Sequence, residues 1–225
     1  MTLGRTIAVL YRKDLRVELR AKDTLVMLGF FALVLVMVFT FGFSLDPATN
    51  RRVFPSIVWA LLLFAGTLAV GRTFARESRD GAFTALVLSP AHRGGLLLAK
   101  TLVNVTLTTL VVALAVPVVA VMMRVDLMPV LLPVAAQLFL GAWGFALVGT
   151  PLAVMAVNAR FAEVLLPMLV FPLVSPVLIA GVTATGATLG TIAADDPATF
   201  VRLMAAFDVV YAVGGYVLFE RLLTE

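Results

Sequence analysis

The sequence predicts an all-α integral membrane protein, because of its composition and its long apolar runs. Of its 225 residues, 62% are hydrophobic and only 13% are charged, whereas soluble domains average about 45–50% apolar and about 25% charged residues. Several uncharged runs reach the roughly 18 residues that indicate a membrane-spanning helix. A β-barrel would show segments of about ten residues with an alternating pattern, so these continuous runs favour helices.

The apolar runs and the polar breaks between them predict one domain, 1–225, with six spans. We expect the spans at about residues 24–44, 53–70, 96–123, 134–157, 165–182 and 202–219. The first run is longer than the 7–15 residues typical of a signal peptide, so it is expected to remain as an anchor. Trp59, near one end of its span, is expected at the membrane interface.

Prolines are expected to shape the two longest uncharged stretches. Pro129 and Pro133 are predicted to keep the first residues of the fourth run out of the helix. Pro167, Pro172 and Pro176 are predicted to interrupt the backbone hydrogen-bond ladder of the fifth helix, since proline removes a donor, and the freed backbone groups are expected to need partners inside protein or a cavity. The weakly apolar stretch 183–194 that follows is predicted to be a re-entrant or surface segment.

Residues 1–23 predict an amphipathic helix on the membrane surface. At 100° per residue, one face collects basic side chains and the opposite face collects apolar ones, as in interfacial helices. The basic face holds Arg5, Arg12, Lys13, Arg16 and Arg20. Asp14 and Glu18 fall inside the apolar arc. Either they lie at its edge and are solvated, or they meet basic residues of the stretch 72–100.

The stretch 71–100 is the longest polar interruption in the chain, and we interpret residues 71–95 as a coupling element. It is either an ordinary solvated basic loop or a docking site for a separate motor protein. The short apolar run 83–88 favours docking, because it is too short to span and needs a protein surface to cover it. Large side chains there would each contribute about 1.5–3 kcal/mol on burial. The candidate coupling residues are Arg76, Glu77, Arg79, Asp80, Gly81, Phe83, Leu86, Ser89 and Pro90.

The distribution of basic residues predicts the orientation. All but four of the 17 Lys and Arg residues fall on the side that carries the termini and the stretch 71–100. Cytoplasmic segments carry the excess of Lys and Arg, so both termini are expected on the cytoplasmic side of the membrane. In a membrane protein the net charge of +4 reflects this topology and gives no reason to expect nucleic acid as a partner.

The chain offers little for chemistry of its own, and we predict no catalytic or metal site. It has no Cys. The glycines before Lys100 do not match the phosphate-binding pattern G-x-x-x-x-G-K-[ST], so any ATP is expected on another chain. His92 is expected to be a solvated loop residue rather than a ligand. Asp208, the one acid within a span, either makes a polar contact to a neighbouring helix or substrate, or lies near the outer interface, where it is hydrated or bonded to nearby backbone.

Several short motifs are spread over nearly the whole chain. They are Arg12-Lys13-Asp14-Leu15 with Glu18, Phe74-Ala75-Arg76-Glu77 with Asp80-Gly81, Leu88-Ser89-Pro90, Lys100, Glu163-x-Leu165-Leu166-Pro167 with Pro172 and Pro176, and Ala206-Phe207-Asp208. Together they resemble the permeases of ABC-2-type exporters, and most closely the CcmB family, the haem exporter protein B of cytochrome c maturation.

The resemblance implies a permease subunit, with no enzyme activity of its own, in a transporter for cytochrome c maturation. Its partners would be a CcmA-like ATPase that binds ATP, CcmC- and CcmD-like membrane proteins, a CcmE-like haem chaperone, membrane lipid and a second copy of this chain. ATP hydrolysis would drive haem export or release of the haem-loaded chaperone. Haem contact is left open. A permease for another cargo, such as a lipid or drug, is the alternative, and a membrane-embedded enzyme is a weaker one.

Overall fold

The computed structural model describes residues 3–21, 23–42, 46–79, 93–156, 162–193 and 196–222, with residues 72–79 described through their backbone alone. This part of the chain is helical apart from short turns. The elements are α1 (Leu3–Ala21), α2 (Asp23–Gly42), α3 (Pro47–Arg79), α5 (Arg93–Met122), η1 (Met128–Val130), α6 (Leu131–Ala156), α7 (Ala162–Thr188) and α8 (Pro197–Leu222).

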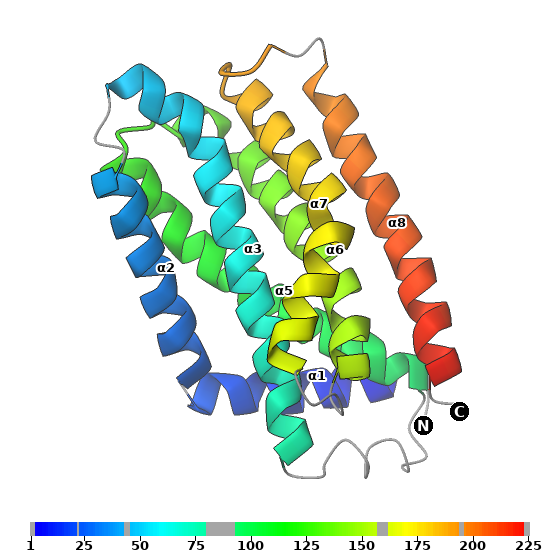
Figure 1. The fold of residues 1–225 in the computed structure, drawn as a ribbon. Coiled ribbons are helices and arrows are strands. Elements are labelled where there is room, and N and C mark those ends of the chain that lie inside the picture. The colour runs from blue at the N-terminus through cyan, green and yellow to red at the C-terminus, as the bar shows by residue number, and fades with distance from the viewer. Residues whose placement is uncertain are drawn as a thin grey trace.

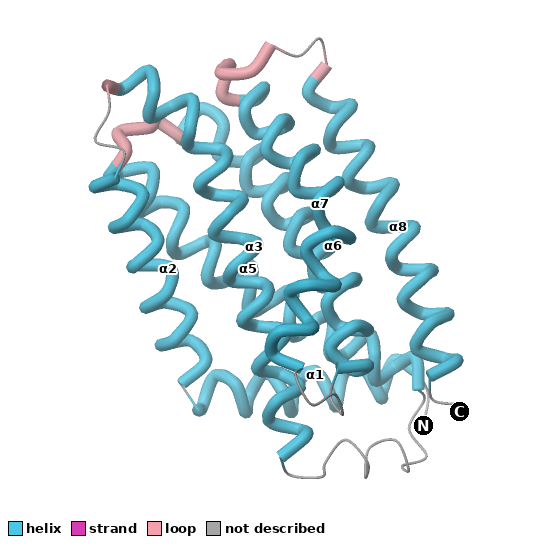
Figure 2. The backbone as a smooth tube through the Cα atoms, in the orientation of Figure 1, coloured by secondary structure: helices cyan, strands magenta, loops and turns pink. Residues whose placement is uncertain are grey.

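Six of these helices run side by side as a bundle, and α1 lies across one end of it, nearly at right angles to the others (Figure 1). The described turns gather at the opposite end (Figure 2). Helix α3 lies inside and packs against α2, α5, α6 and α7, whereas α8 lies at the edge and packs mainly against α6 and α7.

The described helices confirm an all-α membrane protein. Five of them are long and apolar enough to cross a membrane: Pro47–Gly71, Gly94–Met122, Met128–Ala156, Val164–Thr188 and Pro197–Val217. Helix α2 adds a shorter apolar stretch over Gly29–Phe39. The count of six spans therefore stays a prediction, although the helix bounds lie close to most of the expected ones.

Trp59 joins three helices at the centre of the bundle and is buried, so its expected place at the membrane interface is wrong. A Cβ atom at Gly141 of α6 or at Gly181 of α7 would overlap the indole ring. The ring nitrogen donates to Thr185 Oγ1 at 2.9 Å, and that hydroxyl donates to Gln137 Oε1 at 2.9 Å. Small residues allow such close helix approach in membranes.

The three prolines of the fifth span leave helix α7 unbroken, and a side chain replaces one of the backbone hydrogen bonds that they remove. The helix is continuous from Ala162 to Thr188 with Pro167, Pro172 and Pro176 inside it. Pro176 has no N–H for the carbonyl of Pro172, but the hydroxyl of Ser175 donates to that oxygen at 2.7 Å. Side chains that satisfy freed backbone groups allow proline within membrane helices.

Two further boundaries differ from the sequence-based expectation. Helix α7 extends through residues 183–188, which were expected outside the fifth span. Thr183 donates to the Ile179 carbonyl of its own helix, and Thr185 donates to Gln137 of α6. Helix α6 starts at Leu131, so Pro133 lies in its first turn rather than before it. Proline is tolerated there, because the first N–H groups of a helix have no intrahelical partner.

Candidate coupling interface between α1 and α5

Helix α1 packs closely against the first turns of α5. Gly95 permits this approach, since a Cβ there would lie only 3.1 Å from Thr6 Cγ2. Thr6, Asp14 and Glu18 are buried on the side of α1 that faces the bundle. The amphipathic pattern therefore positions two acids against a helix that carries a buried lysine.

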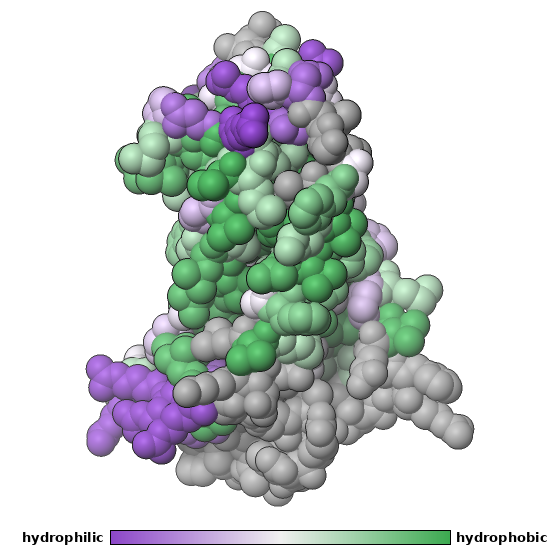
Figure 3. Space-filling model, turned by 90° about the vertical axis from the view of Figure 1, so that its left-hand side faces the viewer, coloured by the Kyte–Doolittle hydropathy of each residue, from purple (hydrophilic) through white to green (hydrophobic). Residues whose placement is uncertain are grey.

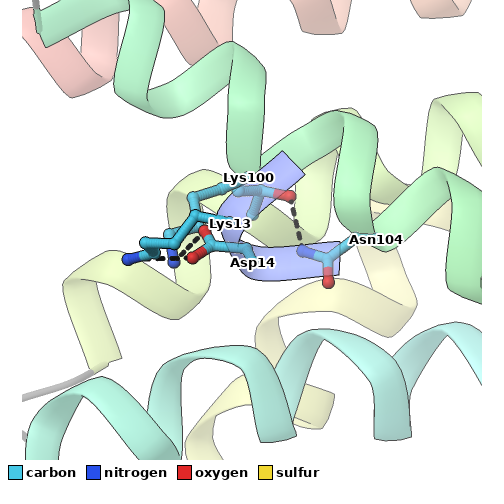
Figure 4. Close-up of polar contacts among 5 residues, drawn as sticks. Lys13, Asp14, Lys100 and Asn104 are labelled. Atoms are coloured by element: carbon cyan, nitrogen blue, oxygen red, sulfur yellow. Dashed lines mark hydrogen bonds and ion pairs between the residues drawn. The ribbon is translucent and has the colours of Figure 1, made fainter. Parts of the chain in front are cut away.

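Lys100 and Asp14 form the central contact of this interface. Lys100 Nζ lies 2.7 Å from Asp14 Oδ2, and the two side chains are only 4% and 10% exposed. Lys13 Nζ lies 3.0 Å from the other carboxylate oxygen but is 51% exposed. Figure 4 shows both lysines reaching toward the same carboxylate. A buried pair is screened far less than an exposed one, so the Lys100 contact dominates the electrostatics here.

A second polar contact fixes the direction of α1 along α5. The hydroxyls of Tyr11 and Thr106 lie 3.0 Å apart. Because the Thr106 hydroxyl already donates to the Leu102 carbonyl at 2.8 Å, Tyr11 is the donor between the two. Two contacts at separate points hold a helix against rotation as well as against sliding.

Helix α5 is in turn joined to α6 by a polar contact. Lys100, Asn104 and Thr108 are buried at four-residue spacing and form a polar stripe on one face of α5. Asn104 Nδ2 donates to Thr150 Oγ1 of α6 at 3.1 Å. Polar side chains inside a membrane bundle commonly bond across helices. The chain of contacts thus runs from α1 through α5 to α6.

The charged residues predicted on the surface helix lie on two opposite faces of α1. Arg12 and Arg16 are exposed on the far side of α1, whereas Asp14 and Glu18 are buried against the bundle. The alternative in which both acids are solvated is wrong, and Asp14 does meet a basic residue of the stretch 72–100. Sequence reasoning missed Tyr11, Asn104, Thr106 and Thr150. The spacing of Lys100, Asn104 and Thr108 in an apolar run is the signal that could have indicated the interface.

The predicted coupling residues lie at the edge of what the structure describes. Arg76, Glu77 and Arg79 belong to the last turns of α3, which continues past its expected end at residue 70, but their side chains are outside the description. The other candidates, Asp80, Gly81, Phe83, Leu86, Ser89 and Pro90, lie outside the described residues. The backbone on either side shows that α3 and α5 lead directly into this connection.

Asp208 lies in the middle of α8 and is buried against α6. Its side chain is excluded from solvent, so the hydrated position near the outer interface is wrong. A Cβ at Gly144 would overlap Asp208 Oδ1, so the glycine provides the space for the carboxylate. Within the described residues its two oxygens have no hydrogen-bond partner. One turn later, Tyr211 donates to the carbonyl of Leu173 in α7.

The described side chains include no group of three His, Cys, Asp or Glu residues that could hold a metal ion. A bundle of long apolar helices, with an amphipathic helix held across one end by a buried ion pair, defines a multi-span helical membrane protein. The model of the CcmB protein family matches residues 5–217. The chain belongs to the CcmB family.

Curated relatives cover most of the chain. Heme exporter protein B of Paracoccus denitrificans is 32% identical over 197 residues, which are 86% of this chain and 87% of the relative. The protein of the same name from Bradyrhizobium diazoefficiens is 29% identical over 81% of this chain and 82% of its own length. That of Pseudomonas aeruginosa is 32% identical over 72% of each.

Proposed function

We propose that this chain is the permease subunit of an ABC exporter for cytochrome c maturation. A partner ATPase supplies the hydrolysis of ATP, and this subunit converts it into haem export or release of a haem-loaded chaperone. Membership of the CcmB family and relatives named heme exporter protein B support this proposal. The sequence lacks the phosphate-binding pattern G-x-x-x-x-G-K-[ST], which is consistent with ATP bound by a partner chain.

The observation that carries the proposed mechanism is the buried ion pair between Lys100 and Asp14. Residues 80–92 connect α3 to α5, and Lys100 follows soon after this connection. A force applied by an ATPase at the connection reaches the start of α5 first. Because Lys100 Nζ is 2.7 Å from Asp14 Oδ2 inside a protein interface, α1 follows α5 instead of sliding along it.

The proposed assembly follows from this mechanism and from the family. The partners are a CcmA-like ATPase on the cytoplasmic side, CcmC- and CcmD-like membrane proteins, a CcmE-like chaperone on the outer side and a second copy of this chain. The chain would lie in the bacterial inner membrane with both termini on the cytoplasmic side. The excess of Lys and Arg on the α1 side supports that orientation.

A charge swap tests the coupling role of the pair. The complex is purified with its ATPase, and ATP hydrolysis is measured in lipid nanodiscs for Asp14→Lys, Lys100→Asp and the double variant. Each single change should lower the hydrolysis that depends on the permease, and the double variant should restore much of it. Equal loss in all three variants, with assembly intact, would contradict the mechanism.

A second experiment addresses the docking residues. Glu77→Arg combined with Asp80→Arg should weaken co-purification of the ATPase, because the charges at an interface set partner and register. Arg51→Gln with Arg52→Gln at the other end of α3 is the control. Unchanged assembly and hydrolysis in the first variant would exclude docking at this element.

A further inference from the structure

The face of α1 that points away from the bundle carries a row of arginines. Arg12, Arg16 and Arg20 follow one another at four-residue intervals, so they are about 6 Å apart along the helix. All three are exposed. Together with Leu15 and Leu19 they line an open groove of about 460 Å³. The row is therefore a concave surface that alternates guanidinium groups with apolar side chains.

These arginines have no acidic counterpart in the described part of the chain. The carboxylates of α1 itself, Asp14 and Glu18, are buried on the opposite face. The ion pairs of Asp14 go to Lys13 and Lys100, and neither involves the arginine row. Positive charges four residues apart on one helix face repel one another by about 0.2–0.5 kcal/mol per pair, so a neighbouring source of negative charge would stabilise the row.

The position of the row relative to the membrane indicates that source. Figure 3 shows a hydrophilic patch that projects sideways at the lower end of the apolar surface, at the level where α1 crosses the bundle. The apolar surface above it is the part that lipid tails cover. Val9 and Val17 of α1 are also exposed, so this helix presents apolar and cationic groups together at the boundary between lipid tails and water.

We propose that Arg12, Arg16 and Arg20 form a binding site for the phosphate groups of anionic phospholipids in the leaflet on the α1 side. Guanidinium groups bind phosphate through paired hydrogen bonds. Basic clusters on amphipathic helices bind anionic membrane surfaces. Leu15 and Leu19 contact the acyl chains, which a soluble anion lacks. An acidic protein surface would match the charges but would not explain the sideways position beside the apolar surface.

The site gives α1 two anchors on opposite faces. Asp14 holds it to α5 from the bundle side, and lipid phosphates hold it to the leaflet from the other side. This inference concerns the contact with the membrane and does not depend on the proposed coupling to an ATPase.

Binding of a fluorescent phosphatidylglycerol to the purified full chain, in neutral detergent micelles, tests the proposal. Changing Arg12, Arg16 and Arg20 to Gln should raise the dissociation constant about fivefold for each arginine and about a hundredfold for all three. The control variant changes Arg51, Arg52 and Arg124 to Gln, which alters the net charge equally, and it should bind as the parent does. Phosphatidylcholine should not distinguish the variants.

Other outcomes would overturn the site. Equal weakening in the control variant would mean nonspecific attraction. Displacement of the lipid by inorganic phosphate alone would mean a site for a soluble anion. Unchanged lipid binding with loss of a co-purified protein would assign the row to that protein. If the glutamine variant fails to fold, the test is the salt dependence of lipid binding by the parent chain. Its affinity for phosphatidylglycerol should fall at least tenfold in 1 M salt, where the screening length is about 3 Å, and an unchanged affinity would contradict the site.

Discussion

Removing the amine of Lys100 should cost far more stability than removing that of Lys13, although both lysines contact the same carboxylate. Lys100→Met leaves Asp14 in a nearly dry interface with one half-exposed lysine. Breaking a buried pair from one side costs about 3–5 kcal/mol, and we expect about 3 kcal/mol because Lys13 remains. Lys13→Met removes an exposed pair, which contributes about 0–1 kcal/mol.

The assay is reversible unfolding of the full chain in mixed micelles, followed by circular dichroism and tryptophan fluorescence. The double variant Asp14→Leu with Lys100→Met provides the decisive comparison, because an apolar pair of similar volume often replaces a buried ion pair without loss. It should recover most of the stability lost by Lys100→Met. If the two lysine variants lose the same stability, or if the losses at Asp14 and Lys100 simply add, the assignment of Asp14–Lys100 as a buried, coupled pair is refuted.

Further predictions concern substitutions at Gly144, Gly29 and Asp46. Gly144→Ala should destabilise the bundle by about 1–3 kcal/mol through overpacking against Asp208, and Asp208→Ala should relieve most of that loss. Gly29→Ala, with nothing within 4 Å of the added atom, should leave stability equal or slightly higher in the same unfolding measurement. Asp46 caps α3, and hydrogen bonds from Thr49 lower its pKa below the usual 3.8. A lowered folded-state pKa means that this stabilisation is present above about pH 4 and is lost as the pH falls further. Asp46→Asn should weaken the dependence of the melting temperature on pH between about pH 5 and pH 2. An equally steep dependence in this variant would contradict the role of Asp46.

Hydropathy predicted most of the fold because burial of apolar surface in lipid depends on composition and length alone. The first expected span, 24–44, nearly coincides with α2, and the third, 96–123, with α5. Family resemblance gave the protein class. The errors occur where local rules were applied without their surroundings, as at residues 183–188 of α7 and at Trp59.

The errors in α7 and at Trp59 have a common physical reason. In water, a helix rich in proline, threonine and glycine is weak. Inside this bundle Ser175 satisfies the carbonyl that Pro176 leaves free, and Thr185 bonds both Trp59 and Gln137. The partners of Thr185 lie on two other helices, so no window along the sequence contains them, whereas Ser175 stands directly before Pro176 in the sequence.

The sequence indicated the acidic residues of the candidate interface but not their contact with α5. The acids Asp14 and Glu18 were conspicuous because they interrupt an apolar arc. Their relation to Lys100 depends on the angle at which α1 crosses α5, and that angle is set by close contacts such as the one between Thr6 and Gly95. A lysine at the start of an apolar run predicts snorkelling to the interface, and here the carboxylate that its amine meets belongs to α1, which lies across one end of the bundle.

Helix α3 is much longer than the membrane is thick. Its 33 residues span about 50 Å at 1.5 Å per residue, whereas the hydrocarbon core is about 30 Å deep. Its apolar part runs over Pro47–Gly71, so its last turns, up to Arg79, extend beyond the part that lipid covers. One continuous helix therefore joins the region outside the lipid to the apolar bundle, where Trp59 packs against Gly141 and Gly181.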